Sequence, residues 1–431
     1  MRAFARQIFL DTLQEISISR VFQKKVEYLR GVLRVEDDLY NLDEYERVSV
    51  IAMGKAANAM LEALIAQTGP RFEGVVVCLQ EPTSQIARFR YFLGGHPFPN
   101  SESVAAARTI LKHVAGATEH TLVIYLISGG ASAMVEAPFF EEITLDDLVA
   151  TYRVLVHSGA TITEINAIRK HFSAIKGGRL ARAAYPAQQV SIMVSDVPER
   201  CLDALASGPT MPDSSTVDDC YCIADTHGLI PQMPASVRAI FEEHALEETT
   251  KGDDPAFVNS RWWPVLSSAT AAQAAAALLK KHGFHVEIDN TPDDWPSEKA
   301  ADYLLARIRE LRGRGPKVAL VSAGEIILKL HRESGIGGRN QHFALQCAEK
   351  IAGENLTVLS AGTDGIDGNS IAAGAVVDGT TWRRAKEIGQ DARQALANFN
   401  AFPVLERLGD AIVTGPTENN VRDIRLLLVN E

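Results

Sequence analysis

The chain is poor in cysteine, with five cysteines among its 431 residues. Their odd number does not suit a disulfide framework, and only Cys220 and Cys222 lie close together, which excludes a four-ligand zinc site. Scattered single cysteines are typical of a reducing compartment, and we expect a cytoplasmic protein.

Basic residues are also scarce relative to acidic ones, with 43 Lys and Arg against 54 Asp and Glu. The net charge of −11 repels polyanions, so the basic surface of a nucleic-acid-binding protein is missing. An anionic small substrate would then need a local cluster of positive charge. No apolar run approaches the roughly 18 residues of a membrane span, and we expect no membrane partner.

Two common nucleotide-binding signatures are absent. Gly54-Lys55 lacks both the upstream glycine and the following Ser or Thr of a Walker A loop. The segment from Gly335 to Asn340 ends in Asn and follows no clean apolar strand, so it fails as a dinucleotide fingerprint. The amino terminus has no signal-peptide core, and residues 4–16 carry an apolar helical face, which predicts a docking helix.

What the chain does contain is a repeated unit of an apolar strand, a small or acidic loop, and a helix. Runs that are apolar on both faces and alternate with helices indicate mostly parallel sheets covered by helices. The fold class is therefore α/β, with two Rossmann-like three-layer domains, 1–250 and 251–431, and an interdomain cleft. The expected strands are Val48–Met53, Val75–Leu79, Leu122–Ile127 and Val190–Val194 in the first domain and Val265–Ser267, Val286–Ile288, Val318–Val321 and Leu356–Leu359 in the second.

The loops after these strands are the expected binding sites, because ligands of open α/β sheets lie beyond the carboxyl ends of the strands. Small residues in them let backbone N–H groups approach phosphate or carboxylate, although tight turns need the same residues. Asp196, Glu325 and Asp364 could hold Mg²⁺, whereas capping or turn formation is favoured for Asp367. The loops begin at Met53, Ser128, Ser195, Ser322 and Ser360.

Positive charge is concentrated in two segments. Arg169, Lys176 and Arg179 have helical spacing, which indicates either a solvated helix surface or an anion clamp. In the segment 337–341 two glycines precede Arg339. The planar guanidinium of an arginine suits a bidentate contact with phosphate or carboxylate. A structural ion pair of Arg339 is the competing interpretation. His96, held between glycines and prolines, is either a hydrogen-bonding loop residue or a catalyst.

Taken together, these motifs resemble the class II glycerate kinases, the glycerate 2-kinases whose carboxyl-terminal half is a MOFRL domain. The resemblance extends from Ile51 to Thr417 and depends on the order and spacing of the motifs rather than on any one of them. The matching motifs are Gly94–Pro99, Ile165–Lys176 with Gly177–Leu180, Ser195–Pro198 with Ala206–Thr210, Gly337–Gln341, Gly362–Asp367 and Thr414–Thr417.

The resemblance implies ATP-dependent phosphorylation of the 2-hydroxyl of D-glycerate, with residues 1–250 as the glycerate kinase domain and 251–431 as the MOFRL-type domain. It implies ATP and glycerate as small-molecule partners, Mg²⁺ or another divalent cation as cofactor, and it allows a homodimer. The implied catalytic residues are Lys55, Arg339 and Asp196, with Asp196 also the metal ligand. The implied substrate-binding residues are His96, Arg169 and Asn340, and the nucleotide-binding residues are Ser128, Gly129, Gly130, Ser132 and Lys55.

Departures from the family pattern leave the acceptor open. Ala131 stands where a third glycine is common, and Glu325-Ile326-Ile327 replaces a stretch usually rich in Thr. A related hydroxy acid such as a four-carbon aldonate is therefore an alternative substrate. Hydroxypyruvate reduction and non-catalytic sensing of hydroxy acids are the alternative functions. The missing dinucleotide fingerprint disfavours the reductase, and the missing basic helical appendage disfavours the sensor.

Overall fold

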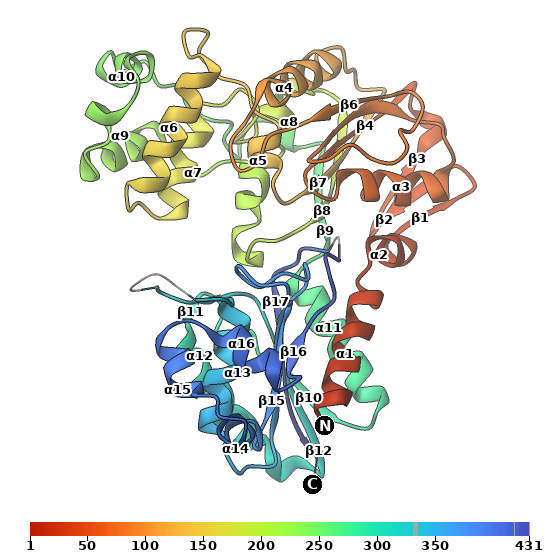
Figure 1. Ribbon diagram of the computed structural model, residues 1–431. Coiled ribbons are helices and arrows are strands. Elements are labelled where there is room, and N and C mark those ends of the chain that lie inside the picture. The colour runs from red at the N-terminus through yellow and green to blue at the C-terminus, as the bar shows by residue number, and fades with distance from the viewer. Residues whose placement is uncertain (331–334, 418, 431) are drawn as a thin grey trace. The chain divides into compact units, whose positions relative to one another are not determined.

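The structure, a computed structural model, describes residues 1–330, 335–417 and 419–430 (Figure 1). The chain forms two compact units. Phe22–Val265 make the N-terminal unit, and Met1–Val21 together with Leu266–Glu431 make the C-terminal unit. The expected division has one boundary, at residue 250, whereas the packing assigns the first 21 residues to the unit that contains the end of the chain.

The N-terminal unit is built on a six-stranded sheet. Its pairs from β6 to β8 are parallel, as predicted, and all eight residues of β7 are buried because both faces of the sheet are covered. In order across the sheet the strands are β6 (Phe89–Leu93), β5 (Glu73–Cys78), β4 (Arg47–Met53), β7 (Thr121–Ser128), β8 (Gln188–Val194) and β9 (Ser260–Leu266).

The edge strand β9 corrects one expectation. Val265–Ser267 was expected to begin the second domain, but β9 pairs with the first sheet, next to β8. A buried apolar run has the same pattern in either sheet, so the sequence does not reveal its partner. A separate antiparallel sheet precedes these strands and contains β1 (Val26–Leu29), β2 (Val32–Val35) and β3 (Asp38–Asn41).

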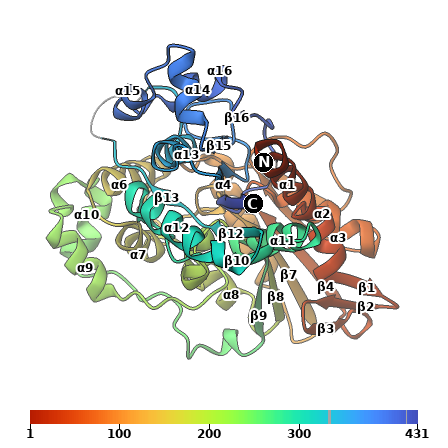
Figure 2. The same ribbon diagram turned by 90° about the horizontal axis from the view of Figure 1, so that it is seen from below.

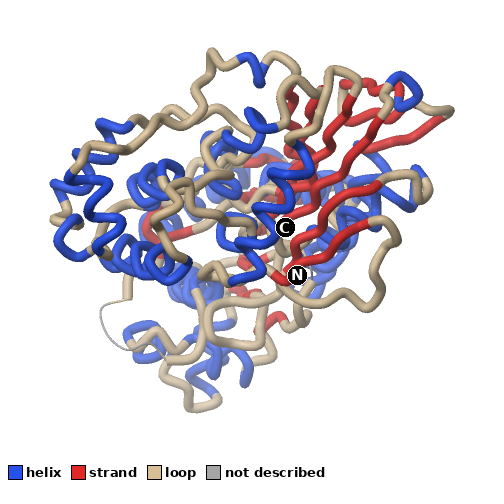
Figure 3. Tube along the Cα trace, turned by 90° about the horizontal axis from the view of Figure 1, so that it is seen from above, coloured by secondary structure: helices blue, strands red, loops and turns tan. Residues whose placement is uncertain are grey.

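Helices complete the N-terminal unit. Four of them, α6, α7, α9 and α10, share a separate apolar core and lie together to one side of the six-stranded sheet of this unit (Figures 2 and 3). The helices are α2 (Ile18–Lys25, which crosses the unit boundary), α3 (Ala57–Thr68), α4 (Ser101–Val114), α5 (Ala131–Met134), α6 (Leu145–His157), α7 (Ile162–His171), α8 (Arg179–Ala183), α9 (Val217–Thr226) and α10 (Ala235–Glu242), with 3-10 turns η1 (Leu42–Glu44), η2 (Glu199–Ser207), η3 (Ile230–Gln232) and η4 (Pro255–Phe257).

The sheet of the C-terminal unit is mixed, which corrects the expectation of a mostly parallel sheet. Of its described strand pairs, β10 with β12 is parallel and the others are antiparallel. The strand β17 lies between β12 and β14 and is antiparallel to both. The sequence could not predict this, because an apolar run does not indicate the direction of its neighbouring strands. In order the strands are β10 (His285–Ile288), β12 (Lys317–Ala323), β17 (Asp423–Asn430), β14 (Thr357–Gly362), β15 (Gly374–Asp378) and β16 (Ala411–Ile412).

Two layers of helices enclose this sheet (Figure 1). The helices α12 and α13 pack on one face in a common apolar core, and α1 and α11 contact the strands as well as each other. The elements are α1 (Arg2–Glu15), α11 (Ser268–Lys281), α12 (Ser297–Leu311), η5 (Arg312–Arg314), α13 (Arg339–Lys350), α14 (Thr381–Glu387), α15 (Ala392–Ala397), α16 (Ala401–Arg407) and a small parallel pair, β11 (Trp295–Pro296) with β13 (Ile326–Ile327).

The amino-terminal helix α1 is the predicted docking helix. Ile8 and Leu13 are buried, and the ring of Phe4 stacks on Phe284 with centroids 5.5 Å apart. Arg2 donates to Asp410 over 2.5 Å. Among the described residues, no helix is both long enough and apolar enough to cross a bilayer.

Candidate functional site

The loop after β4 interlocks with the loop after β7. The N–H of Lys55 donates to the carbonyl of Gly129 over 2.9 Å, and the N–H of Ala56 donates to Ser128 Oγ over 3.0 Å. Gly54 has a φ of +114°, and a Cβ on it would lie 2.4 Å from the Ser128 carbonyl oxygen. Only glycine fits such a close approach, so the two strand ends form one rigid surface.

Side chains that follow three strands of the sheet, β4, β6 and β8, surround the two glycines of this surface. A Cβ on Gly129 would lie 1.9 Å from the Asp196 carboxylate, which therefore crosses directly over the loop. A Cβ on Gly130 would lie 3.2 Å from Lys55 Cγ and 3.3 Å from His96 Cδ2. We call these five residues, with Ser128 and Ser132, the glycine-loop cluster. The parallel sheet thus brings together residues that the sequence places 141 positions apart, from Lys55 to Asp196.

Ser132 is held from outside the loop. Its hydroxyl shares a hydrogen bond of 2.8 Å with Ser207 Oγ. Ser207 and the preceding Ala206 both have positive φ, at 59° and 53°, a conformation that costs energy for residues with a side chain. This strained turn belongs to the segment Ala206–Thr210 that the sequence singled out, and it positions the end of the glycine loop.

Lys55 and His96 also interact electrostatically. Both side chains are exposed, and partial burial, followed by the charge of Lys55, lowers the pKa of His96. The imidazole is therefore largely neutral at pH 7, which suits a hydrogen-bonding partner for a substrate more than a fixed cation.

Replacing Lys55 by Met tests this neighbourhood directly. We expect the pKa of His96 to rise in the variant, because the nearby positive charge that disfavours the imidazolium is removed. NMR titration of the His96 ring protons measures this pKa, and Lys112→Met, an exposed substitution on α4, is the matched control. An unchanged His96 pKa in Lys55→Met would show that the two side chains do not approach each other in solution.

The basic residues around α7 do not form the expected common helix surface. The helix ends at His171, so Lys176 and Arg179 do not continue its face. Lys176 is fully buried against Glu136, and Lys170 pairs with Asp213 over 3.0 Å. The sequence allowed two interpretations of these basic residues, a solvated helix surface or a shared anion clamp. Both are wrong for the group as a whole.

Arg169 differs from its basic neighbours. Its guanidinium lies over the ring of Tyr152, 4.4 Å from the centroid, and burial lowers its pKa. Its Nε is buried without a hydrogen-bond partner among the described residues. Of this basic group, Arg169 is the residue that remains a candidate for an anion.

Arg339 begins α13 in the C-terminal unit and is already paired. It binds Asp423 in a bidentate way, with Nε to Oδ2 at 2.7 Å and Nη2 to Oδ1 at 3.0 Å, and Nη2 also lies 2.8 Å from Glu325. These carboxylates raise the pKa of Arg339 against the effect of its burial. The structural ion pair is thus present, and the Arg339 side chain is 35% exposed.

The amides beside Arg339 have internal roles. Asn340 is buried, accepts from Ser360 Oγ over 2.6 Å, and donates its N–H to Asp367 over 3.1 Å. Asp367 also accepts the N–H of Gln341 over 2.8 Å. The buried Asp367 carboxylate therefore caps the start of α13, as favoured from the sequence, and burial raises its pKa to about 6.

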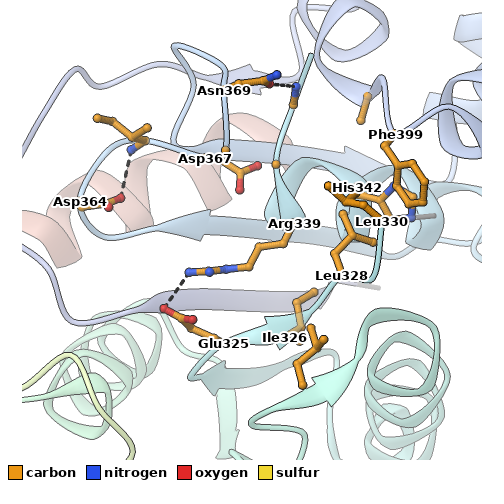
Figure 4. Close-up of a pocket in the computed structure, with 16 residues that line it drawn as sticks. Glu325, Ile326, Leu328, Leu330, Arg339, His342, Asp364, Asp367, Asn369 and Phe399 are labelled. Carbon is orange, nitrogen blue, oxygen red and sulfur yellow. Dashed lines mark hydrogen bonds and ion pairs between the residues drawn. The ribbon is translucent and has the colours of Figure 1, made fainter. Parts of the chain in front are cut away.

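A pocket of about 680 Å³ lies beside Arg339 in the C-terminal unit (Figure 4). Figure 4 shows Arg339, Glu325 and Asp367 on one side of it and His342 with Phe399 on the other. Sequence reasoning missed His342 and Asp423, which stand in ordinary helical and strand contexts, and Phe399, which lies in the turn after α15. It also missed Glu136, whose only signal is its place in the apolar segment from Ala133 to Phe140.

No group of three His, Cys, Asp or Glu in the described parts of the chain is placed to hold a metal ion by itself. Asp196 contributes a single carboxylate next to the glycine loop. That donor set fits Mg²⁺ carried by a nucleotide, because Mg²⁺ commonly takes one or two carboxylates and completes its shell with phosphate oxygens and water.

Comparison with known proteins covers nearly the whole chain. A profile described as a domain of unknown function (DUF4147) matches residues 4–242, and the MOFRL family profile matches residues 318–423. The D-glycerate 2-kinase of Thermotoga maritima is 34% identical over 97% of this chain and 99% of its own length. The glycerate 2-kinase of Pyrococcus horikoshii is 34% identical over 97% of each chain.

Other similar proteins carry a different name or a solved structure. An Agrobacterium vitis protein named as a hydroxypyruvate reductase is 35% identical over 89% of this chain and 87% of its own length. The crystal structure of glycerate kinase from Thermotoga maritima matches with a TM-score of 0.86 at 32% identity, over 99% of each chain. A Pyrococcus horikoshii structure gives a TM-score of 0.87 at 32% identity, over 100% of this chain and 98% of the other.

Proposed function

Because this chain belongs to the glycerate 2-kinase family with DUF4147 and MOFRL regions, we propose that it transfers the γ-phosphoryl group of ATP to the 2-hydroxyl of D-glycerate. The products are 2-phosphoglycerate and ADP. The bond from the γ-phosphorus to the bridging oxygen breaks, and a bond to the substrate oxygen forms as its hydroxyl proton leaves. We place this reaction in the cytoplasm, since all five cysteines are free.

The observation that carries the proposal is the glycine-loop cluster. Phosphoryl transfer depends on positioning and on neutralising charge, with little covalent chemistry for the protein to perform. Gly129 and Gly130 leave the backbone open to phosphate oxygens, and Lys55 is a compact cation beside them. Asp196 is the carboxylate that would hold Mg²⁺, which when bound offsets phosphate charge.

We assign the remaining candidate site residues to the acceptor, the nucleotide or Arg339 according to the chemistry of their side chains. We assign His96, next to Lys55, as a neutral hydrogen-bonding group for the acceptor, and Arg169 as a partly buried guanidinium for its carboxylate. Ser128 and Ser132 complete the nucleotide loop. Asn340 would act by holding the start of α13, and thereby Arg339, because its own side chain is fully engaged inside the unit.

A coupled assay of ADP release over a panel of three- and four-carbon hydroxy acids tests the function. D-Glycerate should give the highest kcat/KM, and phosphorus NMR of the product should show the phosphate on the 2-oxygen. In parallel, the protein with NADH and hydroxypyruvate should leave the nicotinamide absorbance unchanged. Oxidation of NADH without ADP release would reject the kinase in favour of the reductase, and tight binding of glycerate without turnover would favour a sensor.

Arg339→Lys tests whether the guanidinium fork matters beyond its charge. We expect kcat to fall at least about tenfold, because a point charge cannot satisfy Asp423 and a transferring phosphoryl group as a planar fork does. Steady-state kinetics and a thermal melt of the same sample measure this, with Arg383→Lys on the exposed α14 pair as control. A lower melting temperature with near-normal kcat would make Arg339 a structural anchor only.

A further inference from the structure

Arg169 differs from Arg339 in having no carboxylate partner. Its guanidinium forms neither an ion pair nor a hydrogen bond with any described residue, and its Nε is buried. Arg339, by contrast, is held by Asp423 and Glu325. Burial lowers the pKa of Arg169, because a partly desolvated cation without an anion is unfavourable. An anion from outside the chain would remove this penalty.

The contact that holds the Arg169 guanidinium is the ring of Tyr152. The guanidinium carbon lies 4.4 Å from the ring centroid, which is the distance of a cation–π contact. Tyr152 lies on α6 and Arg169 on α7, and both helices belong to the N-terminal unit. Tyr152 is 2% exposed, so water does little to weaken the attraction. An aromatic face attracts the positive charge without neutralising it, which leaves the guanidinium free to bind an anion.

The orientation of this ring is fixed by Glu136. The Tyr152 hydroxyl donates to the Glu136 carboxylate, which also accepts from Lys176 and, over 2.5 Å, from Ser173. Burial raises the pKa of Tyr152, so the hydroxyl stays protonated and remains a donor. Because three donors, one of them a lysine, already engage the Glu136 carboxylate, its charge does not serve Arg169. The network thus fixes the ring and leaves the guanidinium uncompensated.

The same network is attached to the glycine-loop cluster. Glu136 follows Ser132 by four residues, directly after α5. A Cβ on Gly94, two residues before His96, would lie 2.5 Å from the Met134 carbonyl oxygen. The loop of His96 therefore packs directly on the segment that leads to Glu136. One packed segment joins the glycine loop to the network that holds the guanidinium.

We propose that Tyr152, fixed by Glu136, is a positioning residue for the acceptor, because it holds the guanidinium of Arg169 where this group can pair with the carboxylate of a small hydroxy acid. The inference rests on the proposed kinase function and concerns the N-terminal unit alone. A guanidinium that lies flat on a ring still presents its N–H edge, so it can bind a carboxylate by two parallel hydrogen bonds. A ring that is already fixed reduces the ordering that binding requires.

Tyr152→Leu removes the ring and is compared with Tyr152→Phe, which keeps the ring and loses the hydroxyl. In Tyr152→Leu the Kd for D-glycerate, measured by calorimetry, and the KM for D-glycerate should both rise about tenfold, the effect of losing a desolvated cation–π contact. The KM for ATP and kcat at saturating substrates should stay within about twofold of wild type, because the carboxylate does not react. Tyr152→Phe should stay within about threefold of the wild-type KM for D-glycerate. Tyr28→Leu, which removes the ring beneath Arg71, is the matched control.

A double-mutant cycle separates positioning from a merely structural effect. Arg169→Gln should raise the KM for D-glycerate at least about tenfold, and Tyr152→Leu should add less than about twofold in that background. Arg169→Lys changes no core residue and should also raise this KM about tenfold, because an ammonium offers no planar fork. It tests the same geometry where Tyr152→Leu fails to fold.

An unchanged KM for D-glycerate in Arg169→Lys or in folded Tyr152→Leu would overturn the proposal, as would equal increases of the KM for D-glycerate and for ATP. Additive effects in the cycle would also overturn it. A wild-type protein that binds D-glycerate and releases no ADP would instead reject the kinase function. The Kd values of the variants would then still test the positioning role, so the two failures are distinguishable.

Discussion

Replacing Lys55 by Met should lower kcat by about 10²-fold or more, the effect of removing one preorganised donor from a charge-stabilising site. Lys55 stands at the end of β4, and its side chain lies against Gly130 where phosphate oxygens can approach. The ammonium is exposed, so its loss should leave the fold intact. Glycerate binding should be retained, since the proposed function assigns the charge of Lys55 to the phosphates rather than to the acceptor.

Steady-state kinetics of Lys55→Met beside Lys112→Met, with thermal melts of both, measure this effect. Lys112 is an exposed lysine on α4, and its replacement should change neither kcat nor the melting temperature. A kcat near that of the wild type in folded Lys55→Met would remove Lys55 from the mechanism. Asp196 and His96 would then become the principal catalytic candidates of the glycine-loop cluster.

Replacing Lys176 by Met should destabilise the protein by about 3–5 kcal/mol, the usual result of breaking a buried charge pair. Lys176 and Glu136 are both fully buried and in direct contact. Glu136 also accepts from Tyr152 Oη and from Ser173 Oγ. Burial lowers the pKa of Lys176, so its charge depends on this carboxylate, and without the lysine Glu136 is left as an uncompensated acid in the core.

Urea unfolding followed by circular dichroism measures the loss, and the exposed substitution Lys386→Met is the control. The double variant Lys176→Met with Glu136→Gln should recover a large part of the stability, because no uncompensated charge then stays buried. A single variant within about 1 kcal/mol of wild type would show that water or a rearranged partner reaches Glu136. Tyr152 links this network to Arg169, whose guanidinium stacks on its ring, so glycerate KM is a useful second readout.

The sequence by itself was sufficient for many of the strands and for the proximity of one group of candidate residues. Strand runs such as Leu122–Ile127 and Val190–Val194 appear in β7 and β8 almost unchanged, because apolar runs with small residues at their ends leave few other conformations. The loops after parallel strands must meet at one edge of a sheet. For that reason Lys55, Ser128 and Asp196 could be expected together, and the structure brings them together.

Tertiary structure alone decided which distant groups became partners. The strand direction in the second sheet, the pairing of Arg339 with Asp423, and the burial of Lys176 against Glu136 all depend on long-range packing. An apolar run looks the same whether its neighbour is parallel or antiparallel, and a charged residue looks the same whether its partner is a carboxylate or a substrate. The local sequence pattern indicates which side chains a segment can bury. Which strand or charged group it pairs with depends on the free energy of the whole packed unit.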